Sequence, residues 1–329
     1  MTAPAIGLML VGCLYGVVSG FNDGGNLLAV FTAGRVINPR SALLLLLLVP
    51  VGAVLVGGAV ARTVGAGVID LRGQGALGFT LITLISVAVV LLSWRARIPT
   101  SMTLALVGAM LGWVAVGGAG AGVRWAGAGR VVIGMPVSVL AGGVLALAVY
   151  RTVRRLLGRI SNALVLGLAR SQFLTAALQA FAYGANDLGK AVSLIAVARA
   201  LPAPGLPITF DGALPIGAAF VSFALGTLFG GWSLARRIGL GVFRLRPMQA
   251  ASAQLGAGVV VTALALFGAP VSTTQTIDGS LVGVGVGVRA SAVRWNLVRE
   301  MAASWLVTLP AALAAAALIH GALRLVGAG

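Results

Sequence analysis

Residues 20–26 read GFNDGGN, and residues 184–190 read GANDLGK. Each copy places an Asn-Asp pair among glycines inside a long apolar run. An ionisable side chain at the centre of a membrane helix costs about 2.5–3.5 kcal/mol on insertion scales. Two carboxylates at matched positions therefore indicate a functional use rather than a simple cap on a helix break. The glycines favour an unwound segment, with free carbonyls for a cation and free N–H groups for an anion.

Two further features repeat in the same order. The stretch PTSMT at 99–103 returns as PVSTT at 270–274, and Pro136 has a counterpart in Pro310. Three paired features with nearly equal offsets indicate a duplicated chain. With five apolar stretches in each half, the halves have opposite orientations across the membrane. Inverted repeats with interrupted helices are typical of secondary transporters, whose substrate site lies between the halves.

The composition supports a membrane location. Of the 329 residues, 59% are hydrophobic and only 9% are charged, and the mean hydropathy is +1.07. A soluble domain carries about 25% charged residues, and disorder requires low hydrophobicity, so both classes are excluded. No alternating strand pattern recurs, which argues against a β-barrel. The sequence predicts an all-α, polytopic helical membrane protein of about ten spans, built from two inverted-topology repeats with broken helices.

The apolar stretches define the predicted domains. They cover 3–34, 41–61, 76–94, 99–119, 131–150, 171–199, 208–232, 249–268, 270–288 and 301–322. We predict an N-terminal inverted repeat over 1–150, a cytoplasmic basic linker over 151–170 and a C-terminal inverted repeat over 171–329. The stretches 99–119 and 270–288 either cross the membrane or turn back as re-entrant hairpins.

The charge distribution predicts the topology. The net charge is +17, carried mostly by arginines between the apolar stretches, of which 16 fall on one side of the predicted membrane and six on the other. The richer side is expected to be cytoplasmic, with both termini outside. This placement argues against a nucleic-acid partner. Cys13 is the only cysteine and His320 the only histidine, so no Cys-based metal cluster is expected and no metal site is predicted.

Two clusters of Ser and Thr hydroxyls accompany the Asn-Asp motifs: Thr100, Ser101 and Thr103 after Pro99, and Ser272, Thr273 and Thr274 after Pro270. Each follows a proline, which suits the first position of a helix, so the hydroxyls are expected in the first helical turn beside free N–H groups. Hydroxyls and backbone donors together make a neutral site for a tetrahedral oxyanion. The alternative is ordinary Ser/Thr hydrogen bonding between helices.

Two other ionisable residues lie in apolar surroundings. Lys190, the only lysine, takes the place that Asn26 holds in the first repeat. It is either a snorkelling interfacial side chain or a charge partner for Asp187 or for a bound anion. Asp278 either carries a proton or pairs with an arginine.

With these motifs the chain resembles the PiT family of inorganic phosphate transporters. Duplicated motifs of the types G-x-N-D-x-x-N and P-x-S-T-T-H mark that family, and SWLVTLP at 304–310 is similar to its A-W-x-x-T-L-P segment. The resemblance covers about residues 5–320 and implies symport of phosphate with a proton or a sodium ion. The candidate substrate- and ion-binding residues are Asn22, Asp23, Asn26, Ser101, Thr103, Asn186, Asp187, Lys190, Ser272, Thr273 and Thr274, with Asp278 as a candidate proton relay.

Several residues depart from the family pattern. Met102 replaces a hydroxyl, and Leu104, Gln275 and Tyr183 stand where the family often has His. The ammonium group of Lys190 would repel Na⁺ beside Asp187, and proton-coupled bacterial members look similar here, so protons are the expected coupling ion. Such members are also expected to accept phosphate as a neutral complex with a divalent metal. No fixed cofactor is predicted.

The leading hypothesis is therefore a multi-pass phosphate symporter of the cytoplasmic membrane that works by alternating access. A sodium-coupled symporter and a sulfate permease of the same fold are the alternatives. Phosphate near pH 7 can donate hydrogen bonds to Asp23 and Asp187, which sulfate cannot do. An enzyme acting on lipid phosphates is not expected, because the loops are short and His320 is the only histidine. The expected partners are inorganic phosphate and the lipid bilayer, and a homo-oligomer is allowed.

Overall fold

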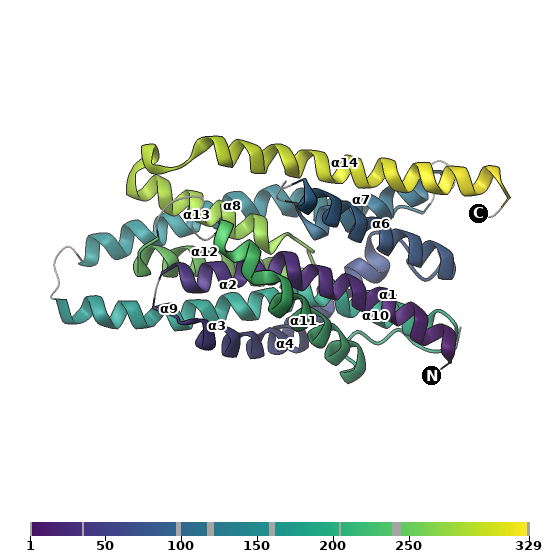
Figure 1. Cartoon of the computed structure of the whole chain (residues 1–329), viewed down its shortest axis with the longest axis horizontal. Helices are drawn as coiled ribbons and strands as arrows, with labels where there is room; N and C mark the ends of the chain where they lie inside the picture. Colours follow the sequence, from purple (N-terminus) through teal and green to yellow (C-terminus); the bar gives the residue numbers. More distant parts are fainter. Residues whose placement is uncertain are drawn as a thin grey trace.

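The protein is a bundle of helices that lie roughly along one common axis (Figure 1). The computed structural model describes residues 2–34, 36–96, 100–116, 122–157, 162–203, 205–238 and 245–327. Within these ranges the structure is helical, and the only strand-like pairing is an isolated bridge between Ile69 and Val123. The all-α prediction is confirmed.

The first half contains α1 (Ala3–Ser19), η1 (Gly20–Gly24), α2 (Gly25–Ala33), α3 (Pro39–Leu45), η2 (Leu46–Leu48), α4 (Val49–Gly52), η3 (Ala53–Gly57), α5 (Gly58–Arg62), η4 (Thr63–Gly67), α6 (Gly75–Arg95), α7 (Met102–Val116) and α8 (Trp125–Leu157). The second half contains α9 (Asn162–Tyr183), η5 (Gly184–Leu188), α10 (Gly189–Ala200), α11 (Ala213–Ile238), α12 (Pro247–Leu266), α13 (Thr273–Arg289), η6 (Ala290–Ala292) and α14 (Trp295–Leu325). Helix α1 begins and α14 ends at the same end of the bundle (Figure 1).

Six helical runs among the described residues are long and apolar enough to cross a membrane. They are Ala3–Thr32, Pro39–Gly67, Gly75–Arg95, Trp125–Leu156, Pro247–Leu266 and Trp295–Leu325. The chain is therefore a multi-pass helical membrane protein. Helices α7 and α13 have 15 and 17 residues, which gives lengths of about 22 and 25 Å at 1.5 Å per residue. Both are shorter than the roughly 30 Å hydrocarbon core of a bilayer.

The two Asn-Asp motifs interrupt their helices less severely than the glycines suggested. Both η1 and η5 are single π-helical turns, and the residues that flank them keep right-handed helical backbone angles. The prediction of an unwound segment is therefore wrong in its local form. A π-helical turn widens the helix by one residue per turn, and such turns occur frequently at functional sites.

Glycines allow each π-helical turn to cross a helix of the other half at backbone contact. A methyl group on Gly20 would lie 2.0 Å from the carbonyl oxygen of Phe223 in α11, and one on Gly184 would lie 1.7 Å from that of Val49 in α4. The partner helices α11 and α4 also place a glycine at each crossing, against the helix that precedes the π-helical turn. Gly226 of α11 lies against the carbonyl of Val17, and Gly52 of α4 against that of Phe181. The two crossings therefore use equivalent residues with the halves exchanged.

The short helices α7 and α13 also pack at equivalent places, each against a long helix of the other half. Gly108 of α7 lies against the carbonyl of Leu309 in α14, and Gly279 of α13 lies against that of Val139 in α8. These contacts make Val139 of α8 equivalent to Leu309 of α14, so the position before Pro310 corresponds to Val139 and not to the residue before Pro136. The two prolines are thus about one helical turn out of register, and they are not the equivalent pair that the sequence suggested.

The predicted linker over 151–170 is largely helical where it is described. Helix α8 continues to Leu157 and α9 begins at Asn162, while residues 158–161 lie outside the described residues.

Candidate substrate and ion site

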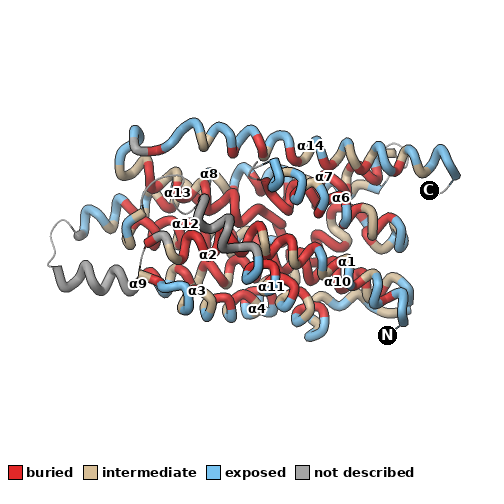
Figure 2. Tube along the Cα trace, in the orientation of Figure 1, coloured by how far each residue is buried: buried red, intermediate tan, exposed pale blue. Residues whose placement is uncertain are grey.

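Eleven of the candidate residues lie in the core of the bundle, on η1, α2, η5, α10 and the N-terminal ends of α7 and α13. None is more than 7% exposed. Figure 2 shows continuous burial through this region, in contrast to the exposed outer faces of the helices. Polar side chains at this depth require hydrogen-bond partners, because no water is available to them in a bilayer.

The carboxylate of Asp23 is held by three neutral donors. Its oxygens accept hydrogen bonds from Ser19 Oγ at 3.0 Å, from Asn22 Nδ2 at 2.8 Å and from Thr274 Oγ1 at 2.9 Å. The Asn26 amide also donates to Thr274 Oγ1, at 3.1 Å. The first turn of α13 is therefore joined to the Asn-Asp motif of the other half.

The carboxylate of Asp187 has a charged partner instead. Lys190 Nζ lies 2.6 Å from Asp187 Oδ1, and the two side chains are only 1% and 2% exposed. The same ammonium group donates to Thr103 Oγ1 at 2.6 Å and to the Val271 carbonyl at 2.9 Å, so all three of its protons are used. Thr273 Oγ1 donates to the second oxygen of Asp187. Lys190 is thus a buried charge partner of Asp187 and not a snorkelling interfacial residue.

The two networks correspond across the repeat. Thr274 contacts Asn26, and the equivalent Thr103 contacts Lys190, which stands in the place of Asn26. The neighbouring residues differ. Thr273 binds Asp187, whereas its counterpart Met102 has no hydroxyl to offer Asp23.

The remaining candidates are local hydrogen-bonding groups. Ser101 Oγ accepts the backbone N–H of Leu104 and Ser272 Oγ accepts that of Gln275, each at 3.3 Å, so both serines cap their helices. Helix α13 begins at Thr273, so Pro270 precedes the helix, and the prediction that it occupies the first helical position is wrong. The corresponding Pro99 lies outside the described residues.

Two of the three candidate asparagines, Asn26 and Asn186, keep a side-chain oxygen for another partner. Asn186 Nδ2 donates to the Ala269 carbonyl at 3.3 Å, and Asn22 Nδ2 lies 3.5 Å from the Thr100 carbonyl. The Oδ1 atoms of Asn26 and Asn186 are buried without a hydrogen-bond partner among the described residues. Buried acceptors of this kind suit a bound cation or a protonated ligand.

Sequence reasoning did not select two tyrosines beside the motifs. Tyr15 and Tyr183 are fully buried, and the hydroxyl of Tyr15 has no hydrogen-bond partner in the described part of the chain. Both rings lie close enough to Asp23 and Asp187 to interact with their charges. The signal was their position, since the chain has three tyrosines and these two shortly precede the Asn-Asp aspartates. The Tyr15 O–H group could donate to an oxyanion, whereas that of Tyr183 interacts with the Thr274 hydroxyl.

Asp278 does not join this cluster. It is 3% exposed and lines a separate cavity, and no arginine in the described ranges pairs with it. The described residues also contain no group of three His, Cys, Asp or Glu side chains that could hold a metal ion. The central site therefore combines hydroxyls, amides, one buried ion pair and one carboxylate with neutral partners. Such a set can bind an oxyanion together with a cation or proton.

Comparison with known proteins agrees with this chemistry. The model of the family described as "Phosphate transporter family" matches residues 19–316. The chain is 32% identical to a "Probable low-affinity inorganic phosphate transporter" of Rhizobium meliloti (strain 1021), over 98% of this chain and 97% of the relative. It is 29% identical to a protein of the same description in Bacillus subtilis (strain 168), over 92% of each. A solved structure titled "The sodium-dependent phosphate transporter" has the same fold, with a TM-score of 0.85, 20% identity and coverage of 98% of this chain and 100% of that one. The chain belongs to the phosphate transporter family.

Proposed function

We propose that the protein is a symporter that imports inorganic phosphate across the cytoplasmic membrane by alternating access. The observation that carries the proposal is the first turn of α13, where the adjacent Thr273 and Thr274 bind Asp187 and Asp23 of the two Asn-Asp motifs. One helix end thus touches both halves of the duplicated site. The family consists of transporters and not enzymes, as the sequence predicted.

The electrostatics of the site favour phosphate over sulfate. A sulfate-selective site should present an uncompensated cation, but Lys190 is neutralised by Asp187 and has no proton left for a ligand. Asp23 and the free Oδ1 atoms of Asn26 and Asn186 are acceptors, which a protonated phosphate can satisfy and a sulfate cannot.

Protons are the proposed coupling ion. The Lys190 ammonium occupies the place beside Asp187 that a metal cation would need, which leaves Asp23 as the carboxylate free to exchange a proton. Sodium is the second candidate, because Asp23 and the unpartnered Oδ1 of Asn26 are oxygen ligands in the half without a lysine. A relay role for Asp278 and co-transport of a divalent metal stay predictions.

The exchanged glycine crossings support the predicted pair of inverted repeats. Gly20 against α11 and Gly184 against α4 are related by exchange of the two halves. Two such bodies, rocking about a site at their interface, are the usual basis of alternating access. Homo-oligomer formation stays a prediction.

Labelled phosphate uptake into proteoliposomes tests the proposal. Uptake is compared under an imposed proton gradient, under an imposed sodium gradient and without a gradient, each with and without excess sulfate. We expect accumulation driven by the proton gradient and insensitive to sulfate. Asp211→Asn, at an exposed carboxylate outside both motifs, is the matched control. Uptake that persists without any gradient would indicate a passive channel, and full competition by sulfate would reject the substrate.

A further inference from the structure

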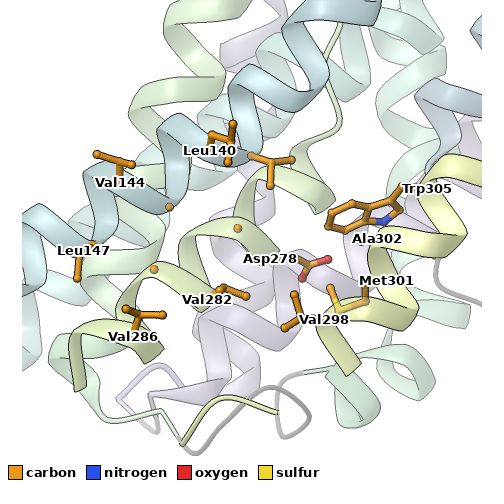
Figure 3. A pocket seen from close by; sticks show the side chains of 14 residues that line it. Leu140, Val144, Leu147, Asp278, Val282, Val286, Val298, Met301, Ala302 and Trp305 are labelled. Atoms are coloured by element: carbon orange, nitrogen blue, oxygen red, sulfur yellow. The ribbon is translucent and has the colours of Figure 1, made fainter. Parts of the chain in front are cut away.

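A cavity of about 380 Å³ lies between α8, α13 and α14, apart from the central site (Figure 3). Its walls are almost entirely apolar and include Leu140 and Val144 of α8, Val282 of α13, and Val298 and Trp305 of α14. Asp278 is the one ionisable side chain in its lining. The volume lies within the roughly 300–1,000 Å³ range of small-molecule sites.

The cavity opens on the outer apolar surface of the bundle. Leu140 and Val144 line it and are 68% and 66% exposed, and they belong to a helix apolar enough to span the membrane. Its floor is the glycine face of α13, where Gly279 and Gly283 lie against the carbonyls of Val139 and Gly143. A ligand would therefore enter from the lipid phase and not through the central site.

Asp278 is the polar feature of this cavity that has no function in the fold. It is only 3% exposed, and its Oδ1 atom is buried without a hydrogen-bond partner among the described residues. Unpaired carboxyl groups in apolar surroundings are costly and are usually paired where they occur in membrane helices. In Figure 3 the carboxyl group and the ring of Trp305 lie on the same side of the cavity.

We propose that this cavity is a binding site for a hydrophobic amine, an ammonium ion with an aliphatic body that enters from the bilayer. The ammonium group binds the Asp278 carboxylate, and the nearby indole of Trp305 adds a cation–π contact. The aliphatic body lies along Leu140, Val144 and Val282. This assignment is independent of the transported substrate, because no residue of the central site lines the cavity.

The site would act on α13, the helix whose first turn donates hydrogen bonds to the central carboxylates. Asp278 lies about one turn after Thr274 along α13. A ligand wedged between α8, α13 and α14 therefore restrains α13, and its binding should slow transport as well as fill the cavity.

A long-chain alkylamine tests the proposal, since an ammonium group held against the Trp305 ring quenches the fluorescence of that indole. The full-length chain in lipid nanodiscs is titrated with dodecylamine, with dodecanol as the uncharged control. We expect saturable quenching by the amine, and Trp305→Phe identifies the part of it that belongs to the cavity. Asp278→Asn should weaken the affinity at least tenfold, and Val282→Phe should also weaken it by filling the cavity. Glu300→Gln, which removes an exposed carboxylate from α14, should leave it unchanged.

Each of the following results would overturn the proposal. Equal amine affinity in the parent chain and Asp278→Asn would show that the carboxylate is not the binding group. Equal affinity for the amine and the alcohol would show apolar partitioning only. Quenching that is unaltered by Trp305→Phe would place the amine elsewhere. If Asp278→Asn keeps amine binding but displaces the pH profile of phosphate uptake, the carboxyl belongs to a proton relay instead.

Discussion

The two Asn-Asp motifs occupy equivalent places but hold their carboxylates differently. Asp23 has only neutral donors, from Ser19, Asn22 and Thr274, whereas Asp187 has the ammonium group of Lys190. One substitution, Lys190 in place of Asn26, accounts for most of this contrast. The two halves thus contain similar hydrogen-bonding sites around a carboxylate, and of the two carboxylates only that of Asp187 has a buried counter-charge among the described residues.

The largest effect is expected from Asp187→Asn. The substitution leaves the Lys190 ammonium buried without its counter-charge, and removing one partner of a buried ion pair costs about 3–5 kcal/mol. We expect phosphate uptake to be lost and the thermal unfolding temperature of the purified protein to fall.

The double variant Asp187→Asn/Lys190→Gln separates these two losses. It removes both charges, so stability should return while uptake stays low. Recovery of uptake in the double variant would show that the pair has only a structural role.

Asp23→Asn removes the carboxylate that has neutral partners. Because no ammonium is left uncompensated, we expect little change in thermal stability but a loss of at least about tenfold in proton-driven uptake, equivalent to about 1.4 kcal/mol. The two measurements are uptake in proteoliposomes and thermal unfolding of the same preparation. A variant with normal uptake would remove Asp23 from the transport cycle.

Lys190→Asn makes the two motifs alike. Without the ammonium group, Asp187 and Asn186 offer oxygen ligands to a cation, so we expect the variant to acquire sodium dependence. Uptake is measured with an imposed sodium gradient against an equal potassium gradient. Uptake that stays proton-driven and indifferent to sodium would show that Lys190 does not select the ion.

Thr273→Met imposes on the second half the side chain that the first half has at Met102. It deletes one hydrogen bond to Asp187, for which a net contribution of about 1 kcal/mol, or about fivefold, is typical. We expect a severalfold reduction of uptake and no change in ion dependence. Thr32→Val removes a hydroxyl that donates only to the Leu28 and Ala29 carbonyls within α2, and it serves as the control.

The membrane fold and the grouping of the motifs could be predicted because both depend on pattern. Apolar length predicts the spans, and the repeat predicts that 20–26 and 184–190 lie at equivalent places. The π-helical turns could not be predicted, because glycine allows both an unwound segment and a helix packed closely against another backbone. Here the carbonyls of Phe223 and Val49 approach Gly20 and Gly184, and the helical form packs against them.

Side-chain roles were harder to predict than positions. The sequence left Lys190 with two interpretations, because only the tertiary structure brings Thr103 and the Val271 carbonyl to its ammonium group. Ser101 and Ser272 were expected near a ligand, but their hydroxyls are used in capping. The register of α8 and α14 depends on glycine contacts, which the spacing of Pro136 and Pro310 does not reveal.

The neighbouring positions of Thr273 and Thr274 have a mechanical consequence. Successive residues of an α-helix point about 100° apart, so the two hydroxyls of α13 reach in different directions, one to each half of the molecule. Rotation of α13 about its own axis swings both hydroxyls in the same sense. A rotation of α13 would therefore change the hydrogen bonding of Asp23 and Asp187 together, although no direct bond joins the two carboxylates.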